Sequence, residues 1–410
     1  MFRRSNEMAD HLPSLSWRRI VPAEETLTRM RPLLPIFGIT RIANVTGLDS
    51  VGIPVVMVNR PNARALAVSQ GKGTSLAAAK VSGLMEAIES WHAEHIDLPL
   101  KRGSYEDLRY SNRLVDPAAL PRPASSPYTP FMPLLWIEAD DLIAGVTAWV
   151  PYELVHMDYR LPFPQGHGCF LASSNGLASG NHRLEAIIHG LCEVIERDAR
   201  TLWSLRDEET QDETRLDLET VADPLCRRLL TRFACAGVEV GVWDMTSDLG
   251  IPSFYCRVVQ GSEGPGQCIG PAYGSGTHLI REVALARALT EAAQCRLTYI
   301  SGARDDLLRE DYQRLLAPAE QARWLSRIRL GAPVRDFNAL PTWGGRSLRG
   351  DLDALLDRLA AVGLAQALVV DLTRREFGIP VVRVIVPGLE GVQTSSGLLP
   401  GPRARRVLGR

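Results

Sequence analysis

Residues 69–89 read SQGKGTSLAAAKVSGLMEAIE, a glycine-rich segment followed by a helical stretch that carries Glu86 and Glu89. The same arrangement recurs after residues 174–181 (SNGLASGN) and after residues 274–277 (GSGT). In each copy an acidic residue lies about thirteen to fifteen positions past the last glycine, and a second Glu or Gln lies three positions further on. Three copies of one arrangement indicate an internal repeat with a common role.

The repeats predict three long helices that present carboxylates, over about residues 75–95, 182–202 and 278–300. Residues three and four positions apart share one helix face, so each helix carries a patch of oxygen ligands. The patches consist of Glu86 with Glu89, of Glu185 with Glu193 and Glu196, and of Glu291 with Gln294. Apolar residues surround the first two patches, and we therefore expect these carboxylates to be partly buried.

Partly buried carboxylates that converge repel one another, and they stay ionised only where cations are supplied. Mg²⁺ is the natural cation, and because it usually keeps waters or phosphate oxygens as ligands, a nucleoside triphosphate is its expected companion. The glycine-rich segments, read as loops, would offer backbone N–H groups to phosphate, and Lys72 would add a point charge. The alternative for any single pair is an ordinary solvated helix face. No P-loop, dinucleotide-binding or protein-kinase signature occurs in the chain.

A second repeat concerns strands. Residues 49–58, 248–259 and 376–386 each contain Gly-Ile-Pro followed by a run rich in β-branched residues. Glycine permits a tight turn and proline restricts the entry to the strand, so each copy predicts a strand entered from a hairpin. Residues 238–243 and 367–372 are themselves strand-like. Strands interleaved with long helices predict a mixed α/β (α+β) protein.

Composition is that of a globular protein, with 45% apolar and 23% charged residues and a formal net charge of −1. This near-neutrality argues against binding nucleic acid or a membrane over the whole surface. No apolar run is long enough to span a bilayer, and seven scattered cysteines favour reduced thiols, so a cytoplasmic protein is expected. Arginines near the C-terminus are expected to lie on a solvated end, the alternative being a local basic patch.

The three repeats resemble the motif blocks of the YcaO family, over about residues 41–391. The resemblance implies a YcaO-like fold, with β-sheets packed against long acidic helices around an ATP and Mg²⁺ pocket. It implies Mg²⁺ ligation by Glu86, Glu89, Glu185, Glu193, Glu196 and Glu291. It implies ATP and phosphate binding by Ser69, Lys72, Asn181, Arg197, Gln294 and Arg296, with Arg19 and Thr26 as the nearest fits to a basic and a hydroxyl residue near the first helix. It leaves the general base unknown.

The resemblance also implies a division of the chain and a reaction. Residues 1–39 are expected to form an N-terminal extension with a first helix, residues 40–391 the catalytic domain and residues 392–410 a basic tail. Family members phosphorylate a backbone amide oxygen of a peptide. The block that begins at Ser69 ends Glu89-Ser90 where the family usually has Glu-Arg, so any role of that arginine is missing or met elsewhere.

Two features indicate which branch of the family the chain resembles. Residues 302–306 (GARDD), 371–373 (DLT) and 387–390 (PGLE) look like the branch that works with TfuA-type proteins and is linked to thioamides. The proline-rich end typical of the azoline-forming branch is absent from the sequence. The expected partners are a precursor peptide or protein and a sulfur-delivering TfuA-like protein, with a homodimer as a candidate assembly. Azoline cyclodehydration, a nucleotide-binding scaffold without chemistry, and a purely structural acidic-helix protein are the alternatives.

Overall fold

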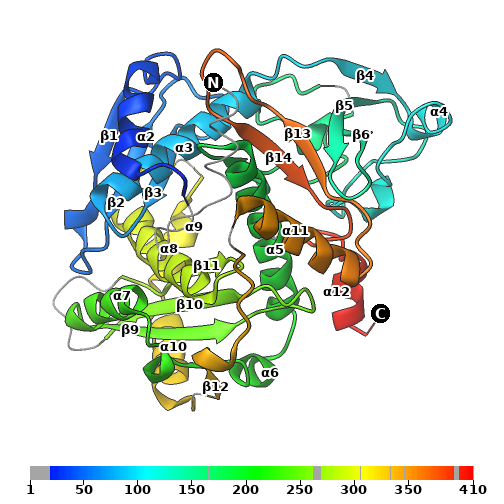
Figure 1. The fold of residues 1–410 in the computed structure, drawn as a ribbon. Coiled ribbons are helices and arrows are strands. Elements are labelled where there is room, and N and C mark those ends of the chain that lie inside the picture. The colour runs from blue at the N-terminus through cyan, green and yellow to red at the C-terminus, as the bar shows by residue number, and fades with distance from the viewer. Residues whose placement is uncertain are drawn as a thin grey trace. The chain divides into compact units, whose positions relative to one another are not determined.

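A computed structural model describes residues 19–409 of the chain except 165, 262–268, 305, 333, 346 and 392–396 (Figure 1). Of the expected N-terminal extension, residues 1–18 therefore lie outside the described residues. The described residues form two compact units that interleave along the sequence. Unit 1 contains residues 88–205 and 345–409 with Arg19 and Ile20, and unit 2 contains residues 21–87 and 206–344.

Unit 1 is built on an antiparallel sheet with the strand order β4-β5-β13-β14-β7, in which β6 also pairs with β5. The strands are β4 (Leu100–Gly103), β5 (Leu134–Asp141), β6 (Val146–Pro151), β7 (Leu177–Ser179), β13 (Leu368–Asp371) and β14 (Val381–Ile385). The helices are α4 (Tyr105–Leu108), α5 (Arg183–Ser204), α11 (Leu348–Ala361) and α12 (Pro402–Val407). Helix α5 packs on β14 and β7, and α11 and α12 pack on α5.

Unit 2 contains two antiparallel three-stranded sheets, β1-β2-β3 and β11-β10-β9, and a short parallel pair, β12-β8. The strands are β1 (Arg41–Asn44), β2 (Val55–Asn59), β3 (Val68–Lys72), β8 (Leu216–Asp217), β9 (Val238–Asp244), β10 (Ser253–Gln260), β11 (Ala272–Thr277) and β12 (Arg335–Asp336). The helices are α2 (Ala23–Met30), α6 (Glu208–Asp212), α7 (Pro224–Cys235), α8 (Arg281–Ser301), α9 (Arg309–Leu315) and α10 (Pro318–Leu330). Helix α8 lies along β11 and β10 and also contacts β3 (Figure 1).

The Gly-Ile-Pro repeats form hairpins, as predicted. Gly52, Gly250 and Gly378 all have positive φ angles, of 69°, 68° and 63°. Strands β2, β10 and β14 begin just after the prolines and pair antiparallel with the strands that precede the turns, β1, β9 and β13. Glycine is favoured at these turns because residues with a side chain rarely adopt positive φ. The predicted mixed α/β fold class is confirmed.

The three long acidic helices also form where predicted, as α3 (Leu76–Glu94), α5 and α8. In α5 the positions Ile187, Leu191 and Ile195 recur at helical spacing and are buried, which is the pattern of a helix that covers a sheet. The His182 side chain accepts a hydrogen bond from the Leu184 N–H and so satisfies one of the free donors of the first turn. Helix α3 belongs to unit 2 as far as Ala87 and to unit 1 from Ile88.

The reading of the glycine-rich segments as loops was wrong, because their central residues lie in β3, β7 and β11. A Cβ on Gly71 would lie 2.0 Å from the Ala79 carbonyl oxygen of α3, and one on Gly274 would lie 2.2 Å from the Ala288 carbonyl oxygen of α8. Glycine is needed here because each strand packs directly against the backbone of the helix that follows it. Close packing, and not a phosphate-cradling loop, accounts for these glycines.

The C-terminal arginines are not all solvated, contrary to the expectation. Arg403 is buried in unit 1 and binds Asp198 of α5, with Nε and Nη2 each about 3 Å from a carboxylate oxygen. Arg405 and Arg406, on the same short helix α12, are exposed as expected. The expectation failed for Arg403 because the sequence gives no sign that a residue 205 positions away supplies a buried partner.

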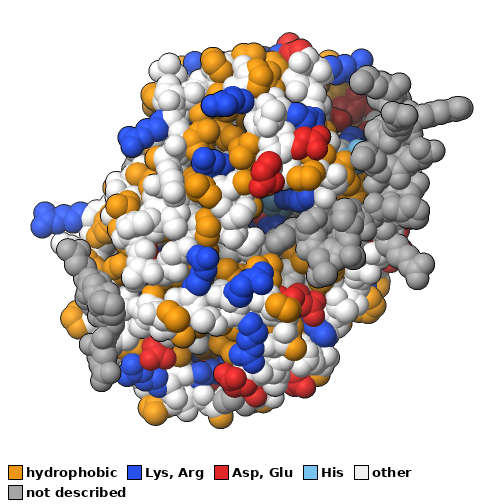
Figure 2. Space-filling view, turned by 60° about the vertical axis from the view of Figure 1, so that its left-hand side comes forward, with side chains coloured by type: hydrophobic (Ala, Val, Ile, Leu, Met, Phe, Trp, Pro, Cys, Tyr) orange, Lys and Arg blue, Asp and Glu red, His pale blue; other side chains and the backbone are white. Residues whose placement is uncertain are grey.

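The surface carries charges of both signs. On the face shown in Figure 2, basic and acidic side chains are interspersed with apolar ones, in keeping with the net charge of −1. None of the described helices combines the length and apolar character needed to cross a bilayer. Cys169, Cys192, Cys226 and Cys256 are buried thiols, and burial raises the pKa of Cys169 to about 11, which disfavours the reactive thiolate.

Candidate functional site

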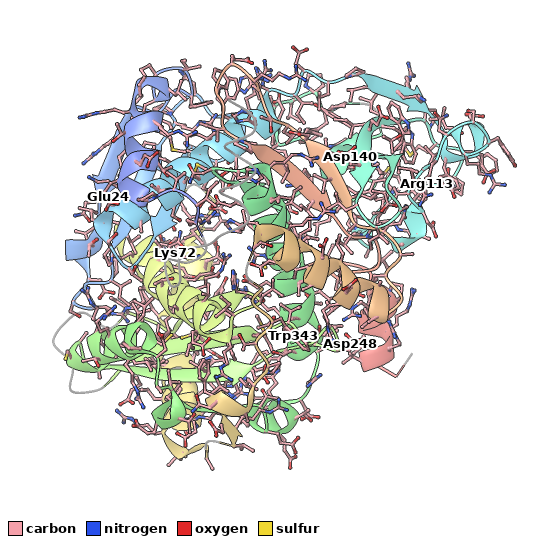
Figure 3. All side chains as sticks on the ribbon, in the orientation of Figure 1. Glu24, Lys72, Arg113, Asp140, Asp248 and Trp343 are labelled. Carbon is pink, nitrogen blue, oxygen red and sulfur yellow. The ribbon has the colours of Figure 1, made fainter. Side chains whose placement is uncertain are left out.

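In unit 2 the first and third sequence repeats meet at Lys72. This residue, labelled in Figure 3, ends β3. Its Nζ lies 2.5 Å from Oε2 of Glu291 on α8. The other carboxylate oxygen of Glu291 accepts hydrogen bonds from the backbone N–H and the hydroxyl of Ser275, at 3.2 and 3.3 Å. Both charged side chains are only about one-fifth exposed. A cation and a carboxylate that were predicted as phosphate and metal ligands are thus side by side.

A second contact ties the same two repeats together. Gln294 lies one turn after Glu291 on α8, and its Nε2 donates to the carbonyl oxygen of Gln70 in β3, at 3.0 Å. The Thr298 hydroxyl, one turn further on, donates to Oε1 of Gln70 at 2.5 Å. These bonds hold β3 in register with α8, so the position of Lys72 is set by the third repeat as well as by its own strand.

Three other predicted ligands of unit 2 are buried. Arg296 is fully buried and binds Asp49 through Nε and Nη2, at 2.8 and 2.9 Å, and Gln260 at 3.2 Å. Ser69 lies within β3, and the hydroxyl of the buried Thr26 donates to the Pro22 carbonyl oxygen at 3.1 Å. These contacts are internal to the fold of unit 2.

The expectation that the carboxylates of the first two repeats would be partly buried was wrong for Glu86, which is exposed. Its neighbours Leu84, Met85, Ala87 and Ile88 are buried, so the covered sides of α3 are occupied by apolar residues and Glu86 points to solvent. Glu89, three positions later, is half-buried.

In unit 1 the second repeat meets the end of α3. The Ser179 hydroxyl, at the end of β7, donates to Oε1 of Glu89 at 2.6 Å. Glu185, in the first turn of α5, is buried and accepts hydrogen bonds from the backbone N–H groups of Ile20 and Asn181, at 2.6 and 2.8 Å. Arg19 lies 3.8 Å from Glu185. Four residues predicted as ligands, from three separate segments, therefore gather at the start of α5 and the end of α3.

Further along α5 lie the other predicted ligands of the second repeat. Glu193 and Arg197 form an ion pair at 3.7 Å on one helix face. Glu196 is almost fully buried. Glu185 and Glu196 are eleven residues apart, three helical turns, which places them on the same face of α5.

The arrangement fits a magnesium nucleotide in its donor chemistry. Within the part of the chain that the structure describes, no group of three or more His, Cys, Asp or Glu side chains is placed to hold a metal ion. Mg²⁺ usually takes only one or two carboxylates from a protein and completes its shell with phosphate oxygens and water. Lys72 with Glu291, Arg19 with Glu185 and Arg197 with Glu193 each pair a basic side chain with one carboxylate, which is donor chemistry compatible with such a shell.

Ser179, Ser275 and Asp49 are site neighbours that sequence reasoning missed. Ser179 and Ser275 lie inside the glycine-rich segments themselves, so their place in the repeat was a usable signal. Asp49 precedes the first Gly-Ile-Pro turn, 247 residues from Arg296, and nothing in the sequence indicates that pairing.

Comparison with known proteins identifies the family. The family model described as "YcaO cyclodehydratase, ATP- and Mg²⁺-binding" matches residues 70–390. An uncharacterized protein in the tfuA 3' region of Rhizobium leguminosarum bv. trifolii is 36% identical over 378 residues, covering 91% of this chain and 88% of that protein. An uncharacterized protein of Methanothermobacter thermautotrophicus is 38% identical over 387 residues, covering 90% and 94%.

Solved structures share the fold. YcaO from Methanopyrus kandleri bound with AMPPCP and Mg²⁺ superposes with a TM-score of 0.68 at 26% identity, covering 91% of this chain and 92% of that one. A heterocyclase in complex with substrate and cofactor has a TM-score of 0.74 and covers 94% of this chain, but at 22% identity it supports the fold alone. This chain spans 55% of that heterocyclase.

Together the fold, the motifs and these matches define an ATP- and Mg²⁺-dependent class of peptide-modifying enzymes. The chain belongs to the YcaO family. ATP and Mg²⁺ are accordingly its cofactors, as the sequence predicted.

Proposed function

We propose that this chain uses ATP to phosphorylate the oxygen of a peptide backbone amide and, with a TfuA-like partner that delivers sulfur, converts the amide to a thioamide. The proposal depends on one observation, the similarity of this chain to the protein in the tfuA 3' region. The two are 36% identical across nine-tenths of this chain. The stretches at residues 302–306, 371–373 and 387–390 add to it from the sequence side.

The reaction requires no redox partner. The amide oxygen takes the γ-phosphoryl group of ATP and ADP leaves, so a poor leaving group becomes a phosphate ester of an imidate. Sulfide-level sulfur from the partner then adds to the carbon, and inorganic phosphate departs with the original oxygen. In the net reaction, amide, ATP and hydrosulfide are consumed, and thioamide, ADP and inorganic phosphate are formed.

The chain's own residues would act by position and charge. Phosphoryl transfer is catalysed mainly by alignment and by stabilising charge on the transferred group. In unit 2 we assign Lys72 to phosphate and Glu86 and Glu291 to Mg²⁺. In unit 1 we assign Arg19, Asn181 and Arg197 to phosphate. We propose that one or two of Glu89, Glu185, Glu193 and Glu196 bind each Mg²⁺. Bound Mg²⁺ would neutralise the charge that develops on the phosphate oxygens.

Four other residues that the resemblance implied as phosphate ligands are proposed to support the site and not to contact phosphate themselves. Gln294 positions β3, as its bond to the Gln70 carbonyl indicates. Ser69, Thr26 and Arg296 are buried in unit 2, and we assign them to support of the phosphate-binding residues. For Arg296 the reason is that Asp49 already engages two of its nitrogens.

Mass spectrometry of a candidate substrate tests the proposal. The purified chain, the TfuA-like protein from the same genome, ATP, Mg²⁺, sulfide and the substrate should give a product in which one oxygen is replaced by sulfur. Loss of one water from the substrate would instead indicate azoline formation, the chemistry named in the family description. Nucleotide binding without turnover or product would indicate a scaffold.

A matched pair of variants ties the result to the site. Glu193→Gln should abolish turnover, because it removes a proposed Mg²⁺ ligand on α5. Glu138→Gln should leave turnover unchanged, because Glu138 is an exposed residue of β5 in the same unit. Equal activity of the two variants would remove Glu193 from the proposed set.

A further inference from the structure

Unit 1 contains a cavity beside α5 and β14 whose lining is mostly apolar but includes one buried cation. The cavity has a volume of about 50 Å³ and is open to solvent on one side. Its apolar lining includes Pro121, Leu171, Val194 and Leu389, and its polar lining is Ser173, Asn175, Arg383 and Glu390.

Arg383, on β14, is the unusual member of this lining. Its side chain is only 2% exposed, and its Nε and Nη2 donate to the carbonyl oxygens of Leu154 and Ser173. Among the described residues, Nη1 has no hydrogen-bond partner. The charge of Glu193 acts on the guanidinium, but no carboxylate of the described residues forms an ion pair with it. Burial lowers the pKa of Arg383 to about 10.

Two other buried arginines of the chain have a carboxylate ion-pair partner, which Arg383 lacks among the described residues. Arg296 and Arg403 are buried to a similar degree, and each binds an aspartate through two nitrogens. The printed hydrogen bonds of Arg383 go only to neutral carbonyls, and the nearby carboxylates of Glu193 and Glu390 form no ion pair with it among the described residues. Its lost hydration is therefore only partly compensated, which is costly. An anion in the cavity would offset that cost.

The cavity also selects the kind of anion. Glu390 lies in the lining, and although its oxygens accept from the Gly401 and Ala404 N–H groups, its charge opposes a dianion such as phosphate. A cavity of about 150 Å³ takes a benzene molecule, so about 50 Å³ suits a carboxylate group with one or two further carbons. The Oδ1 of Asn175 also has no hydrogen-bond partner among the described residues and can accept from an N–H group.

We propose that this cavity binds a carboxylate carried on a short apolar group with an adjacent N–H, as in a glycine or alanine at the C-terminus of a peptide. The carboxylate pairs with Arg383 and the N–H donates to Asn175. A free short aliphatic acid shares the carboxylate but lacks the N–H. This site is independent of the proposed thioamide chemistry and would exist whatever that reaction proves to be.

Methyl NMR titration of the full chain, labelled at valine and leucine methyl groups, tests the site. N-acetylglycine should shift the signals of Val194 and Leu389, and N-acetylglycinamide should bind at least about tenfold more weakly, because a charged hydrogen bond is lost. Acetate should bind more weakly than N-acetylglycine if the ligand is a chain terminus, and equally if it is a free acid. Phosphate should not compete.

Two variants complete the test. Leu171→Phe should fill the cavity and remove the shifts, whereas Leu135→Phe, which alters a different cavity of unit 1, should leave them intact. Arg383→Gln should also abolish binding, and its fold can be checked by circular dichroism. The proposal is overturned if the acid and its amide bind equally well, or if N-acetylglycine shifts neither reporter in the wild-type chain.

Discussion

At the scale of single residues, the chemistry of unit 2 centres on Lys72. Its ammonium group is held by Glu291, which is itself oriented by two bonds from Ser275. An ammonium group fixed in this way can meet phosphate without first losing much side-chain freedom, so little of the binding energy is lost to ordering.

Replacement of Lys72 by glutamine should therefore weaken ATP binding. We expect the KM for ATP to rise by at least about tenfold, because one charged hydrogen bond to phosphate is removed. ATP hydrolysis kinetics measure this effect. The control is Lys80→Gln, on the neighbouring helix α3, which should leave KM unchanged, and a similar KM in all three proteins would exclude Lys72 from the phosphate site.

The different surroundings of Glu86 and Glu89 could not be predicted from the sequence. Glu86 and Glu89 have the same spacing from their repeat as the acidic pair of α5, yet one is exposed and the other is bound by Ser179. Because they are three residues apart, the helical period places Glu86 and Glu89 next to each other on the surface of α3. The contact of Glu89 with Ser179 depends on β7, a strand some ninety residues further along the chain.

At the scale of elements, the repeated unit is a strand packed directly on the following helix. Gly71 and Gly274 allow this in unit 2, because any side chain at either position would collide with a helix carbonyl oxygen. A glycine-rich strand resembles a loop in sequence, since glycine is depleted from strands in general. Helices α3, α5 and α8 were predictable because their apolar positions recur along the chain, whereas the close approach of strand and helix was not.

Gly274→Ala should be destabilising for this reason. The added methyl group must push β11 away from α8, and overpacking of this kind costs about 1–3 kcal/mol. Gly47→Ala is the matched control, because a Cβ there would meet nothing within 4 Å. Urea unfolding should show a lower midpoint for the first variant only, and an unchanged midpoint would show that the strand and helix can separate freely.

Helix α12 is held to α5 by the buried pair of Arg403 and Asp198. Arg403→Met should lower the free energy of unfolding by about 3–5 kcal/mol, because it leaves the Asp198 carboxylate buried without its partner. Arg405→Met, on the exposed face of the same helix, should change it by less than about 0.5 kcal/mol. Chemical denaturation of the two variants measures the difference, and equal stabilities would contradict the assigned role of the pair.

At the scale of the whole molecule, stability should depend on pH through buried histidines. Burial is the main cause that lowers the pKa of His156 to about 4, from an ordinary value of 6.5, with His167 and Arg383 adding to it. Burial likewise lowers the pKa of His92 to about 4. As pH falls below 6.5 the unfolded chain therefore takes up protons that the folded chain refuses until about pH 4. The stabilisation from neutral histidine is complete above pH 6.5 and is lost towards pH 4.

His156→Phe should flatten this dependence. The variant keeps an aromatic ring against Tyr152, whose ring stacks on His156 at 4.7 Å, but it has no group to protonate. Between pH 7 and 4 it should lose about 3 kcal/mol less of its free energy of unfolding than the wild-type chain. Thermal unfolding across this range gives the comparison, and parallel curves would mean that His156 is not kept neutral by the fold.

The sequence by itself determined the strands entered from Gly-Ile-Pro turns, the three acidic helices and the family to which the chain belongs. These depend on local turn chemistry, on helical periodicity and on spacing within short segments, all of which are written along the chain. Tertiary structure alone decided that Lys72 meets Glu291, that Arg296 meets Asp49 and that Arg383 has no carboxylate partner among the described residues. Such pairings join residues hundreds of positions apart, and they are set by how sheets and helices pack, which no local pattern encodes.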